Sequence, residues 1–512
     1  MTVLFRIQQW RKTNQASLII LFFILTIGAI LRLWRISEYM TFLGDEGRDV
    51  LIVKRFIVDH DIPFLGPTAS VGGFFLGPIY YYFMTPFLWI FNLNPVGPAV
   101  MVALFGIATI ALVYWTGKEL FGTVTGFIAS FLYALSPLTI AYSRSSWNPN
   151  IVPFFAILYI FSLWKATSQN TIRWYLVTGI CIGTGLQLHY LFMFLIPVGF
   201  VYLLICRPPS FSRVSLVAII AGAMMMLLPF VGFEIKNRFP NTRTVIQFLT
   251  AGKEVAYTGK EGMVLSDIVF RLFGRLVFYS PPPEQYGRFD QTLLWWWNSA
   301  VVITLAGSFF LLLYHLYYTR NKQYLLVFLW VVFGIGLFSF YQRAIYDYYL
   351  AILFPFPFLM TGWLLQQIGK KKLLIPLAVV ATAGLVLLNW SGRPFLSAPN
   401  RQLAQVRSAA EFVFREAAGK PFNFALITSS NSDHGYRYFL EIWGNPPVTI
   451  ENFDNDPGRS TVTDQLLIIC EVPSCKPLGH SLWEIAGFGQ AEIVGEWEVG
   501  VLKVLKLVHY QG

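Results

Sequence analysis

A short run of acids between two glycines is the part of this sequence best suited to chemistry. The motif GDEGRD occupies residues 44–49, soon after the first long apolar stretch. A carboxylate that the membrane surface partly desolvates has a raised pKa and suits general-base chemistry. We therefore predict that Asp45, or its neighbour Glu46, removes a proton from a substrate, and that the glycines permit a tight backbone turn. The structural alternative is a capped helix start, with Asp45 as the N-cap and Asp49 in the first turn.

Further polar side chains lie at the ends of later apolar stretches, near the depth of lipid headgroups. Arginine binds phosphate through two parallel hydrogen bonds, so Arg144 and Arg343 are candidates to bind a lipid phosphate. Snorkelling toward headgroups is the simpler explanation for either arginine taken alone. His189 can bond a sugar or a phosphate, and a structural histidine fits equally well. Asp347 lies four residues after Arg343, a spacing that favours an ion pair between them.

Amide and aromatic side chains add to this set. Asn148 can hydrogen-bond a sugar hydroxyl, although an amide cannot act as a base. Trp147 and Tyr348 can stack on a sugar ring, and an aromatic belt at the membrane interface explains them as readily.

The elements that position these residues are membrane helices. The chain has 512 residues, of which 55% are hydrophobic and only 13% are charged, which excludes a soluble globular protein. We predict an α-helical polytopic membrane domain over residues 1–390 with about eleven transmembrane helices. The apolar stretches are residues 16–34, 96–117, 121–142, 150–165, 174–188, 190–206, 214–233, 292–318, 323–341, 346–368 and 373–390.

The charges of the loops predict the orientation. Six short loops hold thirteen lysines and arginines and a single acid, Glu119. Basic loops stay in the cytoplasm, so the N-terminus is expected inside and the C-terminus outside. The net charge of +11 therefore reflects membrane topology, and no nucleic-acid partner is expected.

Two long loops are then expected on the outer face, residues 35–95 and residues 234–291. Gly77–Leu93 is apolar enough to span, but a span there would turn the basic loops outward, so we predict a juxtamembrane or re-entrant helix. Within the second loop, Ile268–Ser280 places Arg271 and Arg275 on one face of an interfacial amphipathic helix.

The composition changes near residue 391. Residues 391–512 carry thirteen acids and ten bases, and they alternate one helical pattern, residues 401–417, with four strand patterns. The strands are expected at 422–428, 465–471, 492–499 and 501–508. These patterns predict a small extracytoplasmic α/β domain. Its Cys470 and Cys475 can form a disulfide in an oxidising compartment, and their spacing does not indicate a metal site.

Several motifs occur in an order that resembles the GT-C glycosyltransferases. The motif GDE at 44–46 is followed by GPIYYY at 77–82, GKELFG at 117–122, LSP at 135–137 with Ser143-Arg144, and YDYYLAILFPFP at 346–357. The resemblance covers roughly residues 16–390 and is nearest to the dolichyl-phosphate-mannose protein mannosyltransferase and aminoarabinose transferase group, or glycosyltransferase family 39. It implies that the first-loop acid is the catalytic base and that the donor is a sugar on a polyprenyl phosphate.

The resemblance implies an inverting transferase in the plasma (inner) membrane, acting on an extracytoplasmic protein, lipid or glycan. Its partners would be the lipid-linked donor, that acceptor and membrane lipids. Members of the group often carry a further acid where this chain has Asn148, so we expect no second catalytic carboxylate, no metal and no other cofactor.

Two other functions fit a polytopic chain. A transporter or flippase of lipid-linked sugars predicts inverted repeats and charges within the membrane, which the sequence lacks. A non-catalytic scaffold whose outer domain binds a partner predicts that Asp45 and Glu46 are dispensable.

Overall fold

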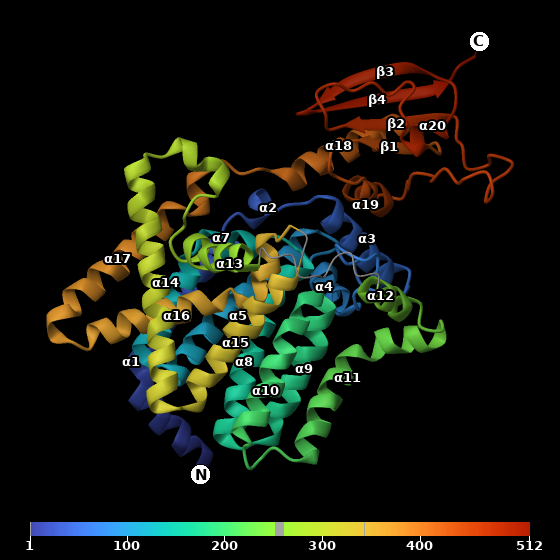
Figure 1. The fold of residues 1–512 in the computed structure, drawn as a ribbon. Coiled ribbons are helices and arrows are strands. Elements are labelled where there is room, and N and C mark those ends of the chain that lie inside the picture. Colours follow the sequence, from blue (N-terminus) through green and yellow to red (C-terminus); the bar gives the residue numbers. More distant parts are fainter. Residues whose placement is uncertain (1, 251–260, 342–343, 512) are drawn as a thin grey trace. The chain divides into compact units, whose positions relative to one another are not determined.

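Helices make up most of the chain (Figure 1). The computed structural model describes residues 2–250, 261–341 and 344–511. Within these ranges, seven helices are long and apolar enough to cross a membrane, or eight if one bent pair counts as a single span. The seven match seven of the eleven predicted stretches. The other four, residues 121–142, 174–188, 190–206 and 346–368, form shorter or broken helices.

The bounds of the elements show where the breaks fall. The first half contains α1 (Thr2–Leu33), α2 (Ile36–Tyr39), α3 (Gly44–Val58), α4 (Ile79–Ile90), α5 (Val96–Leu120), α6 (Thr123–Leu135), α7 (Pro137–Tyr142), η1 (Asn148–Ile151), α8 (Val152–Gln169), α9 (Ile172–Leu188), η2 (Tyr190–Leu195), α10 (Ile196–Cys206), α11 (Arg213–Lys236) and α12 (Pro240–Thr250). The second half contains α13 (Glu261–Leu276), η3 (Pro283–Arg288), α14 (Gln291–Thr319), α15 (Lys322–Gly336), η4 (Leu337–Phe340), η5 (Asp347–Leu353), α16 (Pro355–Gly369), η6 (Lys372–Leu374), α17 (Ile375–Ser391), η7 (Pro394–Leu396), α18 (Gln402–Ala417), α19 (His434–Ile442) and α20 (Trp483–Ala486).

Proline accounts for two of these breaks. Pro137 begins α7 directly after Ser136, whose backbone is extended, so the predicted span 121–142 becomes two helices. Pro355 begins α16 after η5, and the two helices are bent by 56°. Proline lacks the N–H that a continuous helix needs, and its ring clashes with the preceding turn.

Helix α4 lies within residues 77–93, which are apolar enough to span the membrane but were predicted to form a juxtamembrane or re-entrant helix. It contains twelve residues. At the rise of an α-helix these measure about 18 Å, well short of the roughly 30 Å of a hydrocarbon layer. Its length therefore agrees with the prediction that residues 77–93 do not form a span.

The chain divides into two compact units, and the boundaries differ from the predicted division at residue 390. One unit, here the helical unit, comprises Met1–Trp34, Pro63–Phe83 and Ala99–Ala398. The other, here the sheet unit, comprises Arg35–Ile62, Met84–Pro98 and Pro399–Gly512. The first-loop segment joins the C-terminal residues because its apolar side chains pack there. The Phe42 ring lies 5.8 Å from that of Phe439 and 6.3 Å from that of Tyr438.

Within the helical unit, glycines allow close helix packing. A Cβ on Gly179 of α9 would lie 2.0 Å from the carbonyl oxygen of Ile219 in α11, and one on Gly183 would lie 2.4 Å from that of Ala223. Small residues at such crossings let helix backbones approach in membrane proteins. Helix α9 also packs against α8, and α10 against α15, to form the body of this unit (Figure 1).

The sheet unit confirms the predicted α/β architecture. Strands β1 (Asn423–Ile427), β2 (Gln465–Cys470), β3 (Ala491–Val499) and β4 (Leu502–His509) form a sheet in the order β1-β2-β4-β3. β1 and β2 are parallel and fully buried, and the other pairs are antiparallel. The predicted helix and all four strands are present. Helix α19 was not predicted, although Tyr436, Phe439 and Leu440 have helical spacing.

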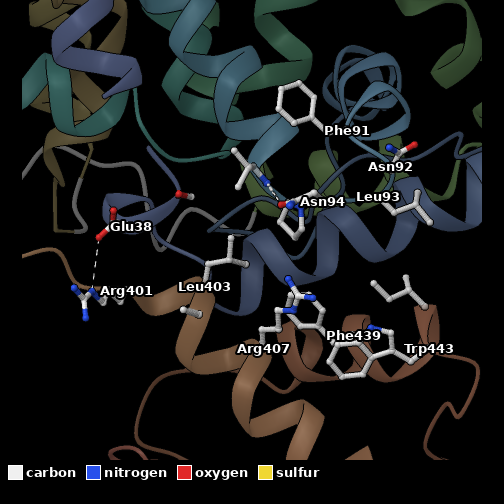
Figure 2. A pocket seen from close by; sticks show the side chains of 15 residues that line it. Glu38, Phe91, Asn92, Leu93, Asn94, Arg401, Leu403, Arg407, Phe439 and Trp443 are labelled. Atoms are coloured by element: carbon white, nitrogen blue, oxygen red, sulfur yellow. Dashed lines mark hydrogen bonds and ion pairs between the residues drawn. The ribbon is translucent and has the colours of Figure 1, made fainter. Parts of the chain in front are cut away.

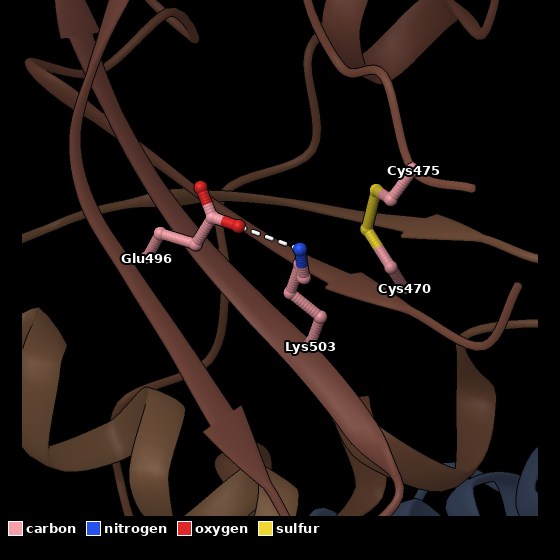
Figure 3. Close-up of a disulfide and its surroundings, with 4 residues drawn as sticks. All are labelled: Cys470, Cys475, Glu496 and Lys503. Carbon is pink, nitrogen blue, oxygen red and sulfur yellow. Dashed lines mark hydrogen bonds and ion pairs between the residues drawn. A yellow bond between two sulfur atoms is a disulfide. The ribbon is translucent and has the colours of Figure 1, made fainter. Parts of the chain in front are cut away.

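A disulfide joins the two cysteines of the sheet unit. Cys470 ends β2, and its bond to Cys475 closes a short loop (Figure 3). On the neighbouring strands, Lys503 and Glu496 form an ion pair of 2.6 Å. The sequence only allowed this disulfide, and the structure contains it.

Candidate active site

The first acid motif begins helix α3, and one of its carboxylates caps that helix. Glu46 accepts hydrogen bonds from the backbone N–H of Leu43, at 3.1 Å, and from the hydroxyl of Thr41, at 2.6 Å. The N-cap position is Leu43, not Asp45. Glu46 is 8% exposed, and its burial raises its pKa. The capped helix start is therefore real, but Glu46 and not Asp45 provides it.

Arg48 lies between the other two acids of the motif. Its guanidinium pairs with Asp45 at 2.9 Å and with Asp49 at 2.8 Å. The Asp49 side chain is fully buried, and this burial raises its pKa to about 6 against the opposing charge of Arg48. The Asp45 side chain is 54% exposed. Of the three acids, Asp45 is thus the one whose carboxylate a substrate can reach.

The two glycines of the motif do not form a tight turn. Both lie within α3 and outside the positive-φ region. Added Cβ atoms would instead collide with residues 432–435 of the same unit. The prediction that the glycines turn the backbone was wrong. Their lack of a side chain instead lets residues 432–435 pack closely against α3.

A second charged cluster lies in the helical unit. Arg271 donates to one carboxylate oxygen of Asp347 through Nε, at 3.1 Å, and Nη2, at 2.5 Å. Arg275 pairs with the other oxygen of Asp347, and Arg271 also pairs with Asp267 at 3.2 Å. The expected partner of Asp347 was Arg343, which lies outside the described residues. In the structure, Asp347 pairs with Arg271 and Arg275, the two arginines of the predicted interfacial helix.

Arg144 has a structural environment. It is 3% exposed and donates through Nη1 to the carbonyl of Leu31, at 2.9 Å, and through Nη2 to that of Trp34, at 2.7 Å. The last carbonyls of a helix lack partners within it, and Arg144 satisfies them for α1. These contacts explain Arg144 without a lipid phosphate.

The remaining predicted residues lie at or beside three short 3₁₀ helices, η1, η2 and η5. The Asn148 amide donates to the carbonyl of Leu188 at 2.5 Å. The His189 ring lies 5.9 Å from the Tyr348 ring, which lies 4.5 Å from that of Trp147. Trp147 and His189 are the N-cap residues of η1 and η2, Tyr348 lies in η5, and η5 contacts both η1 and η2. Non-helical backbone in a membrane protein is tolerated where it is buried or lines a cavity.

Sequence reasoning missed three residues that take part in the site's contacts. Arg48 was not singled out, although its spacing of three residues from Asp45 favours an ion pair on a helix. The hydroxyl pair of Tyr190 and Tyr341, 3.1 Å apart, has no comparable signal because 151 residues separate the two. Among the described residues, no three histidine, cysteine, aspartate or glutamate side chains gather as a metal site.

The sheet unit also contains a cavity of about 710 Å³. Figure 2 shows Arg407 beside Phe439 on its wall and Arg401 paired with Glu38 at 3.7 Å. Glu38 is the one carboxylate among its lining residues, and it also pairs with Arg35. The cavity therefore offers cationic and aromatic surface but no available base.

Part of the chain matches a family of known enzymes. Residues 76–233 match the model described as dolichyl-phosphate-mannose-protein mannosyltransferase. YkcB of Bacillus subtilis (strain 168), which carries a provisional mannosyltransferase name, is 28% identical over 147 residues, or 28% of this chain and 20% of YkcB. YycA of the same organism, named in the same way, is 26% identical over 158 residues, or 31% of this chain and 22% of YycA. The match thus spans about a fifth of the length of these relatives.

Solved structures resemble nearly the whole chain. ArnT from Cupriavidus metallidurans bound to undecaprenyl phosphate has a TM-score of 0.62 at 12% identity, covering 96% of this chain and 98% of ArnT. The oligosaccharyltransferase AglB from Archaeoglobus fulgidus, in complex with an inhibitory peptide and a dolichol-phosphate, has a TM-score of 0.54 at 13% identity, covering 90% of this chain and 70% of AglB. The fold is therefore that of the GT-C glycosyltransferases, and the chain is a multi-pass membrane protein.

Proposed function

We propose that this chain is a membrane glycosyltransferase that moves a sugar from a polyprenyl-phosphate carrier to an acceptor outside the cytoplasm. The accessible carboxylate of Asp45, at the start of the first-loop helix, is the observation that carries the proposal. The mannosyltransferase family match over residues 76–233 supports the reaction class. The lipid phosphates bound to ArnT and AglB, which share the fold, support the donor class.

The proposed reaction is a single displacement. Asp45 takes the proton of an acceptor hydroxyl or amine, whose lone pair attacks the anomeric carbon of the sugar. The bond from that carbon to the phosphate oxygen breaks, its electron pair stays on the polyprenyl phosphate, and the anomeric configuration inverts. A phosphate leaving group needs no proton, so one carboxylate suffices where glycoside hydrolases use two.

Arginines are assigned two separate roles in this proposal. Arg48 holds Asp45 through the 2.9 Å ion pair and so restricts the rotamers of the base. Arg271 and Arg275 are assigned to the departing phosphate, because two guanidinium groups four residues apart on α13 can share one anion. Fixed positive charge at that point stabilises the negative charge that develops in the transition state.

The proposed location of the sheet unit is the extracytoplasmic side. The Cys470–Cys475 disulfide supports it, because disulfides persist mainly in oxidising compartments. The basic loops support it independently, since they belong to the cytoplasmic face. Nucleotide sugars do not reach that side, which agrees with a lipid-carried donor in the plasma membrane.

The test compares two acids of the motif, Asp45 and Glu46. Asp45→Asn should lower the rate of transfer about 10²–10⁴-fold, the usual effect of losing a positioned general base. Glu46→Gln is the matched control, because glutamine can still accept the capping hydrogen bonds. Transfer is measured on purified protein with a polyprenyl-phosphate mannose donor. Near-normal turnover by Asp45→Asn would refute the proposed base.

A further inference from the structure

The start of α3 is held by a side chain that lies 387 residues away in the sequence. The amide Oδ1 of Asn431 accepts a hydrogen bond from the backbone N–H of Gly44 at 2.8 Å. The first N–H groups of a helix have no partner within it, so an outside acceptor fixes where the helix begins. Both residues belong to the sheet unit.

The glycines of the motif make this approach sterically feasible. A Cβ on Gly44 would lie 2.2 Å from Oγ of Ser432, and a Cβ on Gly47 would lie 2.3 Å from the backbone nitrogen of Gly435. Gly44 and Gly47 are three residues apart and so share one helix face. The motif thus combines a helix face without side chains, at Gly44 and Gly47, with the acid Asp45.

Asn431 is itself anchored to the sheet. Its Nδ2 donates to Glu471 at 2.7 Å, and Glu471 also accepts bonds from the hydroxyls of Tyr436, at 2.8 Å, and Thr428, at 2.7 Å. Glu471 directly follows β2, inside the loop that the disulfide closes. An unbroken series of contacts therefore runs from the buried strand through Glu471 and Asn431 to Gly44.

A second anchor holds the far end of the same helix. Glu441, in the last turn of α19, pairs with Lys54 at 3.1 Å and with Arg55 at 3.0 Å. Two anchors about ten residues apart fix both the position and the direction of α3, where one would leave it free to pivot.

We propose that Asn431 is a positioning residue for the transfer reaction, which it serves by holding the α3 turn that carries Asp45 against the C-terminal sheet. The inference rests on the proposed role of Asp45 as base. Asn431 does not touch the reacting atoms in this proposal. A displacement of about 1 Å in a catalytic group can cost on the order of 10²-fold in rate.

The first test is Asn431→Ala, with Asn455→Ala in an exposed loop of the same unit as the matched control. Asn431→Ala should lower kcat about 10–100-fold, within the cost of displacing a catalytic group. The KM for the donor should stay unchanged, because the proposed phosphate ligands lie elsewhere in the chain. Hydrogen exchange should show faster exchange at the amides of residues 44–47 while β2 and β4 keep their protection. An unchanged kcat, or unchanged exchange at residues 44–47, would overturn the proposal.

The second test leaves Asn431 in place. Gly47→Ala puts a methyl group against the backbone of Gly435 and should lower kcat in the same way, whereas Gly458→Ala meets nothing within 4 Å and should not. Full activity in Gly47→Ala would overturn the inference even if Asn431→Ala fails to fold. Glu471→Gln should retain most activity, since glutamine still accepts hydrogen bonds, whereas Glu471→Ala should match Asn431→Ala.

The two proposals fail in different ways. If Asp45→Asn is active, the proposed base is wrong whatever Asn431 does. If Asp45→Asn is inactive while Asn431→Ala and Gly47→Ala keep the wild-type kcat, the base stands and only the positioning role is lost.

Discussion

At the scale of single residues, three acids within five positions have three different environments. Glu46 is buried and caps α3, Asp49 is fully buried against Arg48, and the Asp45 side chain is 54% exposed. Residue type and spacing identified the segment, but exposure alone separates the candidates. Burial raises the pKa values of Glu46 and Asp49, the two buried acids of the motif.

The buried Asp49 leads to a pH-dependent stability. Its folded-state pKa of about 6 lies above the ordinary aspartate value, about 3.9. The stability it contributes is therefore complete below about pH 4 and is lost as the pH rises through 6. Asp49→Asn should stabilise the protein at pH 8, by on the order of 1–3 kcal/mol, and much less at pH 4.5. Thermal unfolding in detergent at the two pH values measures this. The same stability difference between Asp49→Asn and the wild type at both pH values would contradict the prediction.

At the scale of elements, helix α13 forms ion pairs with a residue that is distant in the sequence. The sequence predicted an amphipathic helix over Ile268–Ser280 with Arg271 and Arg275 on one face. The structure contains a helix with both arginines, but its bounds are Glu261–Leu276, so it ends before Ser280. The structure adds Asp347 of η5, which pairs with both arginines. The cluster is preassembled, so a phosphate would meet guanidinium groups already held in place.

The proposed phosphate site predicts a loss of lipid binding. Arg271→Ala should reduce the polyprenyl phosphate that copurifies with the protein, measured by mass spectrometry, and should raise the donor KM several-fold. Arg271→Lys should also be impaired, because an ammonium cannot form two parallel hydrogen bonds. Arg243→Ala, at an exposed arginine of α12, is the control. If Arg271→Lys binds lipid as the wild type does, Arg271 only neutralises Asp347 and Asp267.

At the scale of the whole molecule, the chain combines a helical membrane domain with a sheet unit assembled from distant segments. Residues 35–62 and 84–98 belong to the same compact unit as residues 399–512. The predicted division near residue 390 followed the change in composition. Composition identifies which residues leave the membrane, but it does not show which earlier loops fold with them.

The predicted orientation can be tested by labelling. In a background with Cys181 and Cys206 replaced and the disulfide kept, Asp454→Cys should react with an impermeant thiol reagent applied to intact cells. Lys371→Cys should react only after the cells are opened, because basic loops are retained in the cytoplasm. Reaction of Lys371→Cys in intact cells would reverse every face assignment, including the outer location of Asp45.

Local sequence determined much of this protein. Apolar stretches of membrane length, basic loops, the four strands and the acid motif could all be identified from the chain, because hydropathy and periodicity are properties of neighbouring residues. Tertiary structure decided the environments of the site residues. Asp347 meets Arg271 across 76 residues, Arg144 meets α1 across more than a hundred, and Asn431 meets Gly44 across 387. Contacts at such separations depend on how the elements pack together, and no pattern within one element specifies the partner.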